Sequence, residues 1–247
     1  MGGNGLSQMH ERTEILIGTD GLDHLAGKHV LIAGLGGVGG FAAEVVARAN
    51  IGHMTLLDHD VVGESNMNRQ LVALRSTVGM QKTAVLKHRI ADINPAINVR
   101  VQPDFLDPED VATQLSGGYD YVIDCIDSIA CKAALVHGCQ RLGIPVASSM
   151  GAGGRMDVTK ARIGMLADTD TCPLARELRR HLRRLGGSLD YPVVYSRERP
   201  VKGSEHRPVG SDTHPGRPRS VNGTISYLPA LFGVMLGGFV VKELLGR

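Results

Sequence analysis

Residues 59–82 bring together several side chains that bind and stabilise phosphate groups. Arg69 can grip a phosphate through two parallel hydrogen bonds, and Lys82 can act as a compact point charge. Nucleotidyl and phosphoryl transfer need such groups, because charge develops on the phosphate oxygens and on the leaving pyrophosphate. Hydride transfer has no general need for them. The other candidate ligands in this stretch are Asp60, Ser65, Asn66 and Asn68.

A glycine-rich turn stands just before this stretch. It follows the apolar run HVLIA and precedes a helical pattern at 38–49, which is the context in which such a turn binds phosphate. Asp58 closes the next apolar run, 24 residues after Gly34, where a carboxylate can accept hydrogen bonds from ribose hydroxyls. This pattern favours an adenine nucleotide site over a tight turn that binds nothing. The glycines of the turn are Gly34, Gly36, Gly37, Gly39 and Gly40.

Asp127 ends the strand pattern YDYVIDCID at 119–127. Ligands of open parallel sheets bind at the carboxyl ends of the strands, and a carboxylate there can hold Mg²⁺. The alternative is that Asp127 and Ser128 only cap the helix that follows. Arg69 and Lys82, taken singly, would be ordinary surface residues. Together on one scaffold, these residues favour a catalytic nucleotide site.

The elements that must position these residues alternate between strands and helices. This order predicts an α/β fold with a doubly wound, mostly parallel sheet and helices on both faces. We expect one domain over 1–247, with a nucleotide-binding core at 28–155 and a C-terminal extension at 156–247. The predicted strands are 29–33, 54–58, 98–106, 119–127 and 144–151, and the predicted helices are 6–28, 38–49, 79–93 and 131–142.

The extension contains a predicted basic helix at 174–185. Four leucines fall on one of its faces and five arginines on the opposite one. Ordinary solvated faces mix both signs of charge, so this face favours contact with nucleic-acid phosphates over a merely solvated surface. A second basic tract follows at 197–222, where low apolar content predicts a mobile loop. The arginines of the helix are Arg176, Arg179, Arg180, Arg183 and Arg184.

The overall composition narrows the class of protein. The net charge of the 247 residues is only +2, which does not identify a nucleic-acid-binding protein by itself. Four cysteines without CxxC spacing indicate a reducing, cytoplasmic compartment and argue against a structural zinc site. We expect no signal peptide, because the N-terminus lacks an apolar core. The apolar segment 225–241 is short for a membrane span and contains Pro229, so a buried final helix is favoured over a membrane anchor.

Four segments of the chain resemble the ubiquitin-activating-type (ThiF-type) adenylating enzymes: GLGGVGG, LLDHDVVGESNMNRQ, VGMQKTAVLKHRIADINP and YVIDCIDS. The resemblance implies a homodimer that binds ATP with Mg²⁺ and adenylates a carboxylate. It implies that the glycine turn and Asn66, Arg69 and Lys82 contact phosphates, and that Asp58 binds the ribose. Asp127 would be the magnesium-binding or catalytic aspartate. Arg12 would reach the nucleotide of the partner subunit.

Finer details are similar to the tRNA threonylcarbamoyladenosine dehydratases, notably RTEILIG, NPAINVRVQPDFL and PLARELRRHLRR. This resemblance implies that the threonyl carboxylate of a modified adenosine next to the anticodon is activated by ATP and closes a ring, releasing AMP and pyrophosphate. It also implies a monovalent cation, Na⁺ or K⁺, and sulfur-relay protein partners.

Two alternatives stay open at this point. One is an adenylyltransferase that activates the C-terminal glycine of a ubiquitin-like sulfur carrier, and the other is an inactive nucleotide-binding scaffold. The absence of CxxC pairs and the arginine-rich helix argue against the first. Arg69, Lys82 and Asp127 together argue against the second. Cys172 is expected to be an ordinary loop thiol rather than a sulfur-transfer residue.

Overall fold

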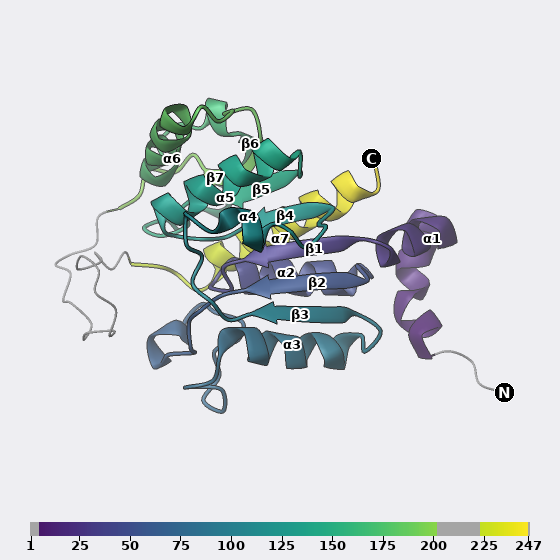
Figure 1. Cartoon of the computed structure of the whole chain (residues 1–247). Helices are drawn as coiled ribbons and strands as arrows, with labels where there is room; N and C mark the ends of the chain where they lie inside the picture. Colours follow the sequence, from purple (N-terminus) through teal and green to yellow (C-terminus); the bar gives the residue numbers. More distant parts are fainter. Residues whose placement is uncertain (1–4, 202–222, 247) are drawn as a thin grey trace.

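The computed structural model describes residues 5–201 and 223–246, with side chains from Gln8 onward. Within these residues a seven-stranded sheet has the order β3-β2-β1-β4-β5-β7-β6 (Figure 1). All neighbouring strands pair in parallel except β6, which runs antiparallel to β7. This confirms the predicted α/β class. The strands are β1 (His29–Ala33), β2 (His53–Leu57), β3 (Asn98–Gln102), β4 (Tyr121–Asp124), β5 (Val146–Ser149), β6 (Ala161–Met165) and β7 (Pro192–Ser196).

Helices cover both faces of the sheet (Figure 1). Side chains alternate along β1, so Val30 joins one apolar cluster and Leu31 joins the other. The first cluster is shared with α2, α3 and α7, and the second with α4, α5 and α6. The helices are α1 (Gly5–Ala26), α2 (Gly39–Arg48), α3 (Lys82–Ile93), α4 (Val111–Gln114), α5 (Ile129–Leu142), α6 (Pro173–Leu185) and α7 (Tyr227–Leu244), with 3-10 turns η1 (Glu64–Asn66), η2 (Val158–Lys160) and η3 (Leu166–Asp168).

The apolar helix α7 packs tightly against α2. By length and composition alone α7 could cross a membrane, but a stripe at every fourth residue is buried inside the protein. Gly233 and Gly237 permit the close approach of the two helices. A Cβ at Gly233 would lie 2.3 Å from the carbonyl oxygen of Val38, and one at Gly237 would lie 3.0 Å from that of Ala42. The packing agrees with the predicted buried final helix. The stripe consists of Leu228, Phe232, Leu236 and Val240.

Several elements are shorter than the sequence pattern predicted. The strand expected at 98–106 ends at Gln102, and the strand expected at 119–127 spans only 121–124. In both cases the residues beyond the strand form loops at the carboxyl edge of the sheet.

The long N-terminal helix is kinked at Gly18, whose φ of 78° and ψ of 166° are not helical. Most of the loop predicted at 197–222 lies outside the described residues.

Candidate nucleotide-binding site

The glycine turn leaves β1 at the point where the strand order of the sheet reverses. β2 lies on one side of β1 and β4 on the other, and α2 begins at Gly39. Gly34 has a φ of +86°, and a Cβ there would lie 2.8 Å from the carbonyl oxygen of Cys125. A Cβ at Gly39 would lie only 1.7 Å from the carbonyl oxygen of Gly34. Both positions therefore require glycine, and together they present the N-terminus of α2 to an anion.

Asp58 lies directly beside this turn and holds it in place. Its side chain is buried, and its Oδ2 accepts a hydrogen bond of 2.6 Å from the backbone N–H of Leu35. Its Oδ1 accepts one of 2.8 Å from the N–H of Asp60. A carboxylate has further acceptor capacity on both oxygens, which leaves room for ribose hydroxyls. The structural contact with Leu35 was not foreseen from the sequence.

Lys82 is the first residue of α3, and its side chain is buried against Asp60. The Lys82 Nζ lies 2.8 Å from Asp60 Oδ2, while the backbone N–H of Lys82 donates to the carbonyl oxygen of Asp60 at 3.1 Å. Nε2 of His59 approaches the other carboxylate oxygen of Asp60 at 3.2 Å. The sequence placed Asp60 and Lys82 in one site, and the structure brings them into direct contact.

The connection between β2 and α3 carries Arg69 to the glycine turn. A Cβ at Gly37 would lie 3.4 Å from Arg69 Cγ, so the two residues are neighbours. The Arg69 Nη1 donates to the carbonyl oxygen of Ser65 at 3.0 Å and to Asn68 Oδ1 at 2.7 Å. Asn66 has a local role, because its Oδ1 accepts a hydrogen bond from the N–H of Gly63. These bonds hold the half-buried Arg69 beside the turn predicted to hold phosphate.

Asp127 is exposed on the loop between β4 and α5. The same loop begins at Cys125, whose carbonyl lies against Gly34, so Asp127 belongs to the same edge of the sheet as the glycine turn. Ser128 occupies the N-cap position of α5 without a side-chain capping hydrogen bond. The capping alternative for Ser128 therefore has no support from the geometry. A solvent-facing carboxylate at this edge suits the oxygen-rich shell that Mg²⁺ prefers.

The described ends of the segment 202–222 flank this edge as well. The N–H of Val201 donates to the carbonyl oxygen of Gly154 at 2.7 Å. The N–H of Gly154 in turn donates to the carbonyl oxygen of Gly223 at 2.7 Å. One residue later, the carbonyl oxygen of Thr224 accepts a hydrogen bond of 3.0 Å from Asn68 Nδ2. The described chain therefore resumes beside Asn68, and Gly154 links this end to Val201.

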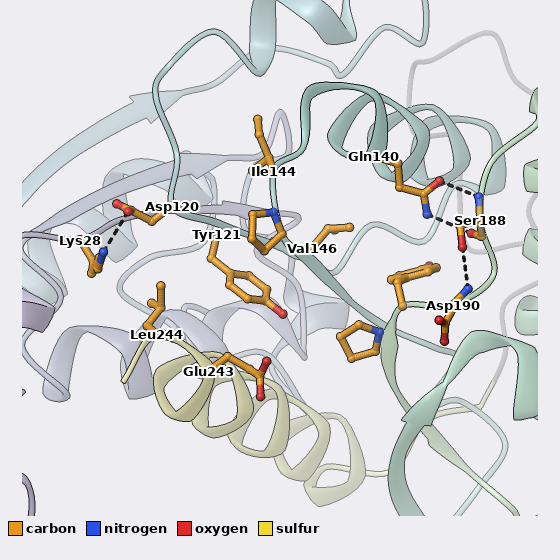
Figure 2. Close-up of a pocket in the computed structure, with 13 residues that line it drawn as sticks. Lys28, Asp120, Tyr121, Gln140, Ile144, Val146, Ser188, Asp190, Glu243 and Leu244 are labelled. Carbon is orange, nitrogen blue, oxygen red and sulfur yellow. Dashed lines mark hydrogen bonds and ion pairs between the residues drawn. The ribbon is translucent and has the colours of Figure 1, made fainter. Parts of the chain in front are cut away.

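Two hollows in the surface of the described residues do not coincide with the predicted ligands. One of about 500 Å³ lies at the opposite, amino-terminal edge of the sheet, between the Lys28–Asp120 ion pair and Glu243 (Figure 2). None of the predicted nucleotide ligands lines it. Another of about 540 Å³ lies between η1 and the following loop, with Glu64 and Arg75 among its lining. The residue chemistry at the carboxyl edge, rather than these hollows, locates the site.

Arg12 lies on α1, which leads into the amino end of β1 (Figure 1). The nucleotide ligands named above gather at the carboxyl edge. An exposed Arg12 is therefore remote from the glycine turn of its own chain.

Two of the four cysteines of the protein are held as neutral thiols. Cys125, Cys131, Cys139 and Cys172 are all free. Burial raises the pKa of Cys139 to about 12 and also raises the pKa of Cys125, so both remain protonated thiols at neutral pH. Cys172 is buried before α6. The thiol of Cys172, expected in a loop, is thus packed inside the protein.

The basic helix α6 buries Ala175, Leu178 and Leu182, whereas Leu185 at its end is 45% exposed. Arg179 departs from the predicted stripe. It is half-buried, and its Nη1 donates to the carbonyl oxygen of Thr169 at 2.8 Å. The guanidinium thus ties α6 to the residues that follow η3. The arginines exposed to solvent are Arg176, Arg180, Arg183 and Arg184.

Comparisons with known proteins agree with this geometry. A tRNA threonylcarbamoyladenosine dehydratase of Bacillus subtilis is 40% identical over 186 residues, which cover 73% of this chain and 72% of that protein. The crystal structure of the Escherichia coli tRNA N6-threonylcarbamoyladenosine dehydratase in complex with ATP superposes with a TM-score of 0.87 at 37% identity, covering 99% of this chain and 96% of that one. A yeast adenylyltransferase and sulfurtransferase is 35% identical over 94 residues, covering 38% of this chain and 21% of that protein. The model of the ThiF family matches residues 10–247. The chain therefore belongs to the ThiF family.

Proposed function

We propose that this chain is an ATP-dependent tRNA threonylcarbamoyladenosine dehydratase. The observation that carries the proposal is the likeness, over almost the whole chain, to an enzyme of that name solved with ATP. A carboxylate is a poor electrophile, and its adenylate offers AMP as a much better leaving group. The threonyl carboxylate would be adenylated first, and a nitrogen of the same side chain would then close the ring. The enzyme itself needs no nucleophile, which agrees with the raised pKa values of Cys125 and Cys139.

The residues of the site divide this work between binding and charge stabilisation. The N–H groups at the start of α2 and the guanidinium of Arg69 would hold phosphate oxygens. Lys82 would neutralise the charge that develops as pyrophosphate leaves. Asp58 would fix the ribose, and Asp127 would hold Mg²⁺, which supplies charge neutralisation at the phosphates. Asn66 would contact phosphate as well, and Ser65, Asn68 and Ser128 would complete the nucleotide site.

The alternative of a sulfur-carrier adenylyltransferase has weaker support. The matching yeast adenylyltransferase aligns over a much shorter part of this chain than the Bacillus subtilis dehydratase does. The absence of CxxC spacing also argues against it. We therefore favour the tRNA substrate.

A homodimer is part of the proposal. Arg12 lies at the amino edge of its own sheet, so it can contact a nucleotide only in a second subunit. Ile15 and Leu16 on the same helix are 82% and 76% exposed. Such apolar exposure on a projecting helix favours burial against another chain.

The four exposed arginines of α6 are proposed to contact tRNA phosphates. Two further exposed arginines, Arg197 and Arg199, precede Val201. On the resemblance alone, we further propose a monovalent cation, Na⁺ or K⁺, sulfur-relay protein partners and a cytoplasmic location. The four free cysteines support a reducing compartment.

One assay tests the proposal directly. The purified protein is given ATP, Mg²⁺ and tRNA that carries threonylcarbamoyladenosine, and the nucleosides are then analysed by mass spectrometry. We expect AMP release together with loss of one water from the modified nucleoside. Pyrophosphate that appears only when a small protein with a Gly-Gly tail is supplied would favour the sulfur-carrier alternative instead.

A further inference from the structure

Beneath the nucleotide site lies an ion pair that is entirely hidden from solvent. Lys132, on the second turn of α5, and Asp124, at the end of β4, both have side chains that are 0% exposed. The Lys132 Nζ lies 2.6 Å from Asp124 Oδ2 and donates a second hydrogen bond, of 3.1 Å, to the carbonyl oxygen of Ser149. This lysine is among the largest fully buried side chains in the described part of the protein.

The pair belongs to a network that joins three strands. The Ser148 hydroxyl donates to Asp124 Oδ2 at 2.6 Å, and the Tyr191 hydroxyl donates to Ser148 Oγ at 3.2 Å. Asp124 ends β4, Ser148 belongs to β5, and Tyr191 directly precedes β7. Lys132 reaches into this network from the helix above it. The carboxylate of Asp124 is thereby fixed by contacts from several directions.

Stability alone does not explain a charge at position 132. Neighbouring buried positions of α5 are apolar, for example Leu135 and Val136. Withdrawing two charges from water is costly, and well-packed apolar residues of similar size often give equal or greater stability. The buried pair therefore calls for another role, and its place in the fold indicates which one.

The constrained carboxylate supports the loop that carries Asp127. The second oxygen of Asp124, Oδ1, accepts a hydrogen bond of 3.1 Å from the N–H of Ile126. The intervening residue, Cys125, donates its N–H to the carbonyl oxygen of Ala33 at 2.8 Å, and its own carbonyl lies against Gly34. The backbone that leads to Asp127 is thus held between Asp124 and the glycine turn.

We propose that Lys132 is a positioning residue, which orients Asp124 and through it the loop that presents Asp127 to the nucleotide. The inference rests on the proposed function only for the part played by Asp127. The contact chain runs from Lys132 Nζ to the Asp124 carboxylate, then to the Ile126 N–H, and so to the next residue of the loop. Lys132 itself touches neither ATP nor substrate.

The test uses variants that separate folding from positioning. Lys132→Met alone leaves an unpaired buried carboxylate and is expected to fold poorly. In Lys132→Met/Asp124→Asn the net charge of the buried pair is unchanged, and the asparagine can still accept the Ile126 N–H. Ser148→Ala is a milder variant that removes one hydrogen bond to Asp124. Val136→Ala, on the same helix, is the matched control for a destabilised core.

Two readouts are measured on the full-length protein. Hydrogen exchange of the backbone amides at 125–128 is followed without nucleotide, and kcat and KM for ATP are measured with modified tRNA. We expect the double variant and Ser148→Ala to exchange faster at 125–128. The double variant should lose about tenfold or more in kcat/KM for ATP. This is the typical effect of removing a residue that does not touch the ligand but orients a residue that does. KM for tRNA should not change.

The outcomes are distinguishable. Val136→Ala should lower the melting temperature while exchange at 125–128 and KM for ATP stay at wild-type values. Wild-type exchange in both the double variant and Ser148→Ala would overturn the proposal, as would wild-type kcat/KM for ATP in a folded double variant. A wild-type protein that does not release AMP would instead contradict the proposed function, and the exchange experiment would still decide whether Lys132 fixes the loop.

Discussion

The ammonium group of Lys82 lies 2.8 Å from the carboxylate of Asp60, at the first turn of α3. Only 5% of the Lys82 side chain is exposed, whereas 51% of the Asp60 side chain is. A buried cation at a helix N-terminus is unfavourable without an anion, because the helix dipole is positive there. In the protein without nucleotide, Asp60 is the anion that pairs with Lys82. A phosphate of bound ATP would be a second anionic partner of Lys82.

Replacement of Asp60 tests this relationship. Asp60→Asn should lower the melting temperature of the protein without nucleotide, by a modest amount equivalent to about 1 kcal/mol because Asp60 is half exposed. ATP with Mg²⁺ should then raise the melting temperature more than it does in the wild type, since phosphate replaces the missing anion. Asp92→Asn, exposed near the other end of α3, is the control. Equal shifts in both variants would show that Lys82 does not meet the nucleotide.

Arg69 should be the most sensitive side chain of the phosphate site. Its guanidinium is already held beside the glycine turn by Ser65 and Asn68, so little rearrangement is needed for it to bind phosphate. We expect Arg69→Ala to lower kcat by about a hundredfold or more, as for other preorganised charge-stabilising groups. Arg75→Ala, an exposed arginine of the same connection, should retain activity. AMP release at the wild-type rate in Arg69→Ala would remove this residue from the site.

The sequence was sufficient to predict the class of fold and the position of the glycine turn. Both depend on local signals: apolar runs of strand length, glycines between a strand and a helix, and Asp58 at the next strand end. Arg69 and Lys82 were predictable as candidates because they follow that strand directly. Their contacts with Ser65, Asn68 and Asp60 depend on how the loop folds back, which spacing alone does not determine.

Lys132 shows what sequence patterns could not provide. A lysine in a helix normally lies in solvent, and nothing in the helix sequence IACKAALVHGCQRL marks position 132 as buried. Its burial arises because α5 packs across β4 and β5, so its second turn meets Asp124 and Ser149. Arg179 is a similar case, since its carbonyl partner Thr169 comes from the preceding turn. Helical periodicity predicts that Arg179 lies on the exposed face of α6. In the structure its side chain is half-buried, because the guanidinium binds the carbonyl oxygen of Thr169.

The glycine turn can be tested by adding single methyl groups. In Gly39→Ala the new Cβ would collide with the carbonyl oxygen of Gly34, so we expect loss of ATP binding and destabilisation by several kcal/mol, as for strongly overpacked sites. In Gly36→Ala the nearest atom, Nε2 of Gln70, would be 3.8 Å away. This variant should fold with wild-type stability and still bind ATP more weakly, because a phosphate must approach the backbone there. Calorimetry with ATP and thermal denaturation distinguish the two effects.

The two kinds of arginine on α6 lead to opposite expectations. Arg180 and Arg183 are exposed, so Arg180→Glu/Arg183→Glu should weaken tRNA binding. The melting temperature should fall only slightly, because the ion pair of Arg180 with Glu177 that is lost lies at the surface. Each arginine that no longer binds a phosphate should reduce the slope of log K against log salt concentration by about one unit. Arg179→Ala should lower the melting temperature, because Arg179 links α6 to the carbonyl oxygens of Leu166 and Thr169, while tRNA affinity and salt slope stay unchanged. Binding measured over a range of salt concentrations separates the variants. If the double reversal binds tRNA with wild-type affinity and slope, α6 is not the docking surface, and the positive charge near Val201 becomes the next candidate.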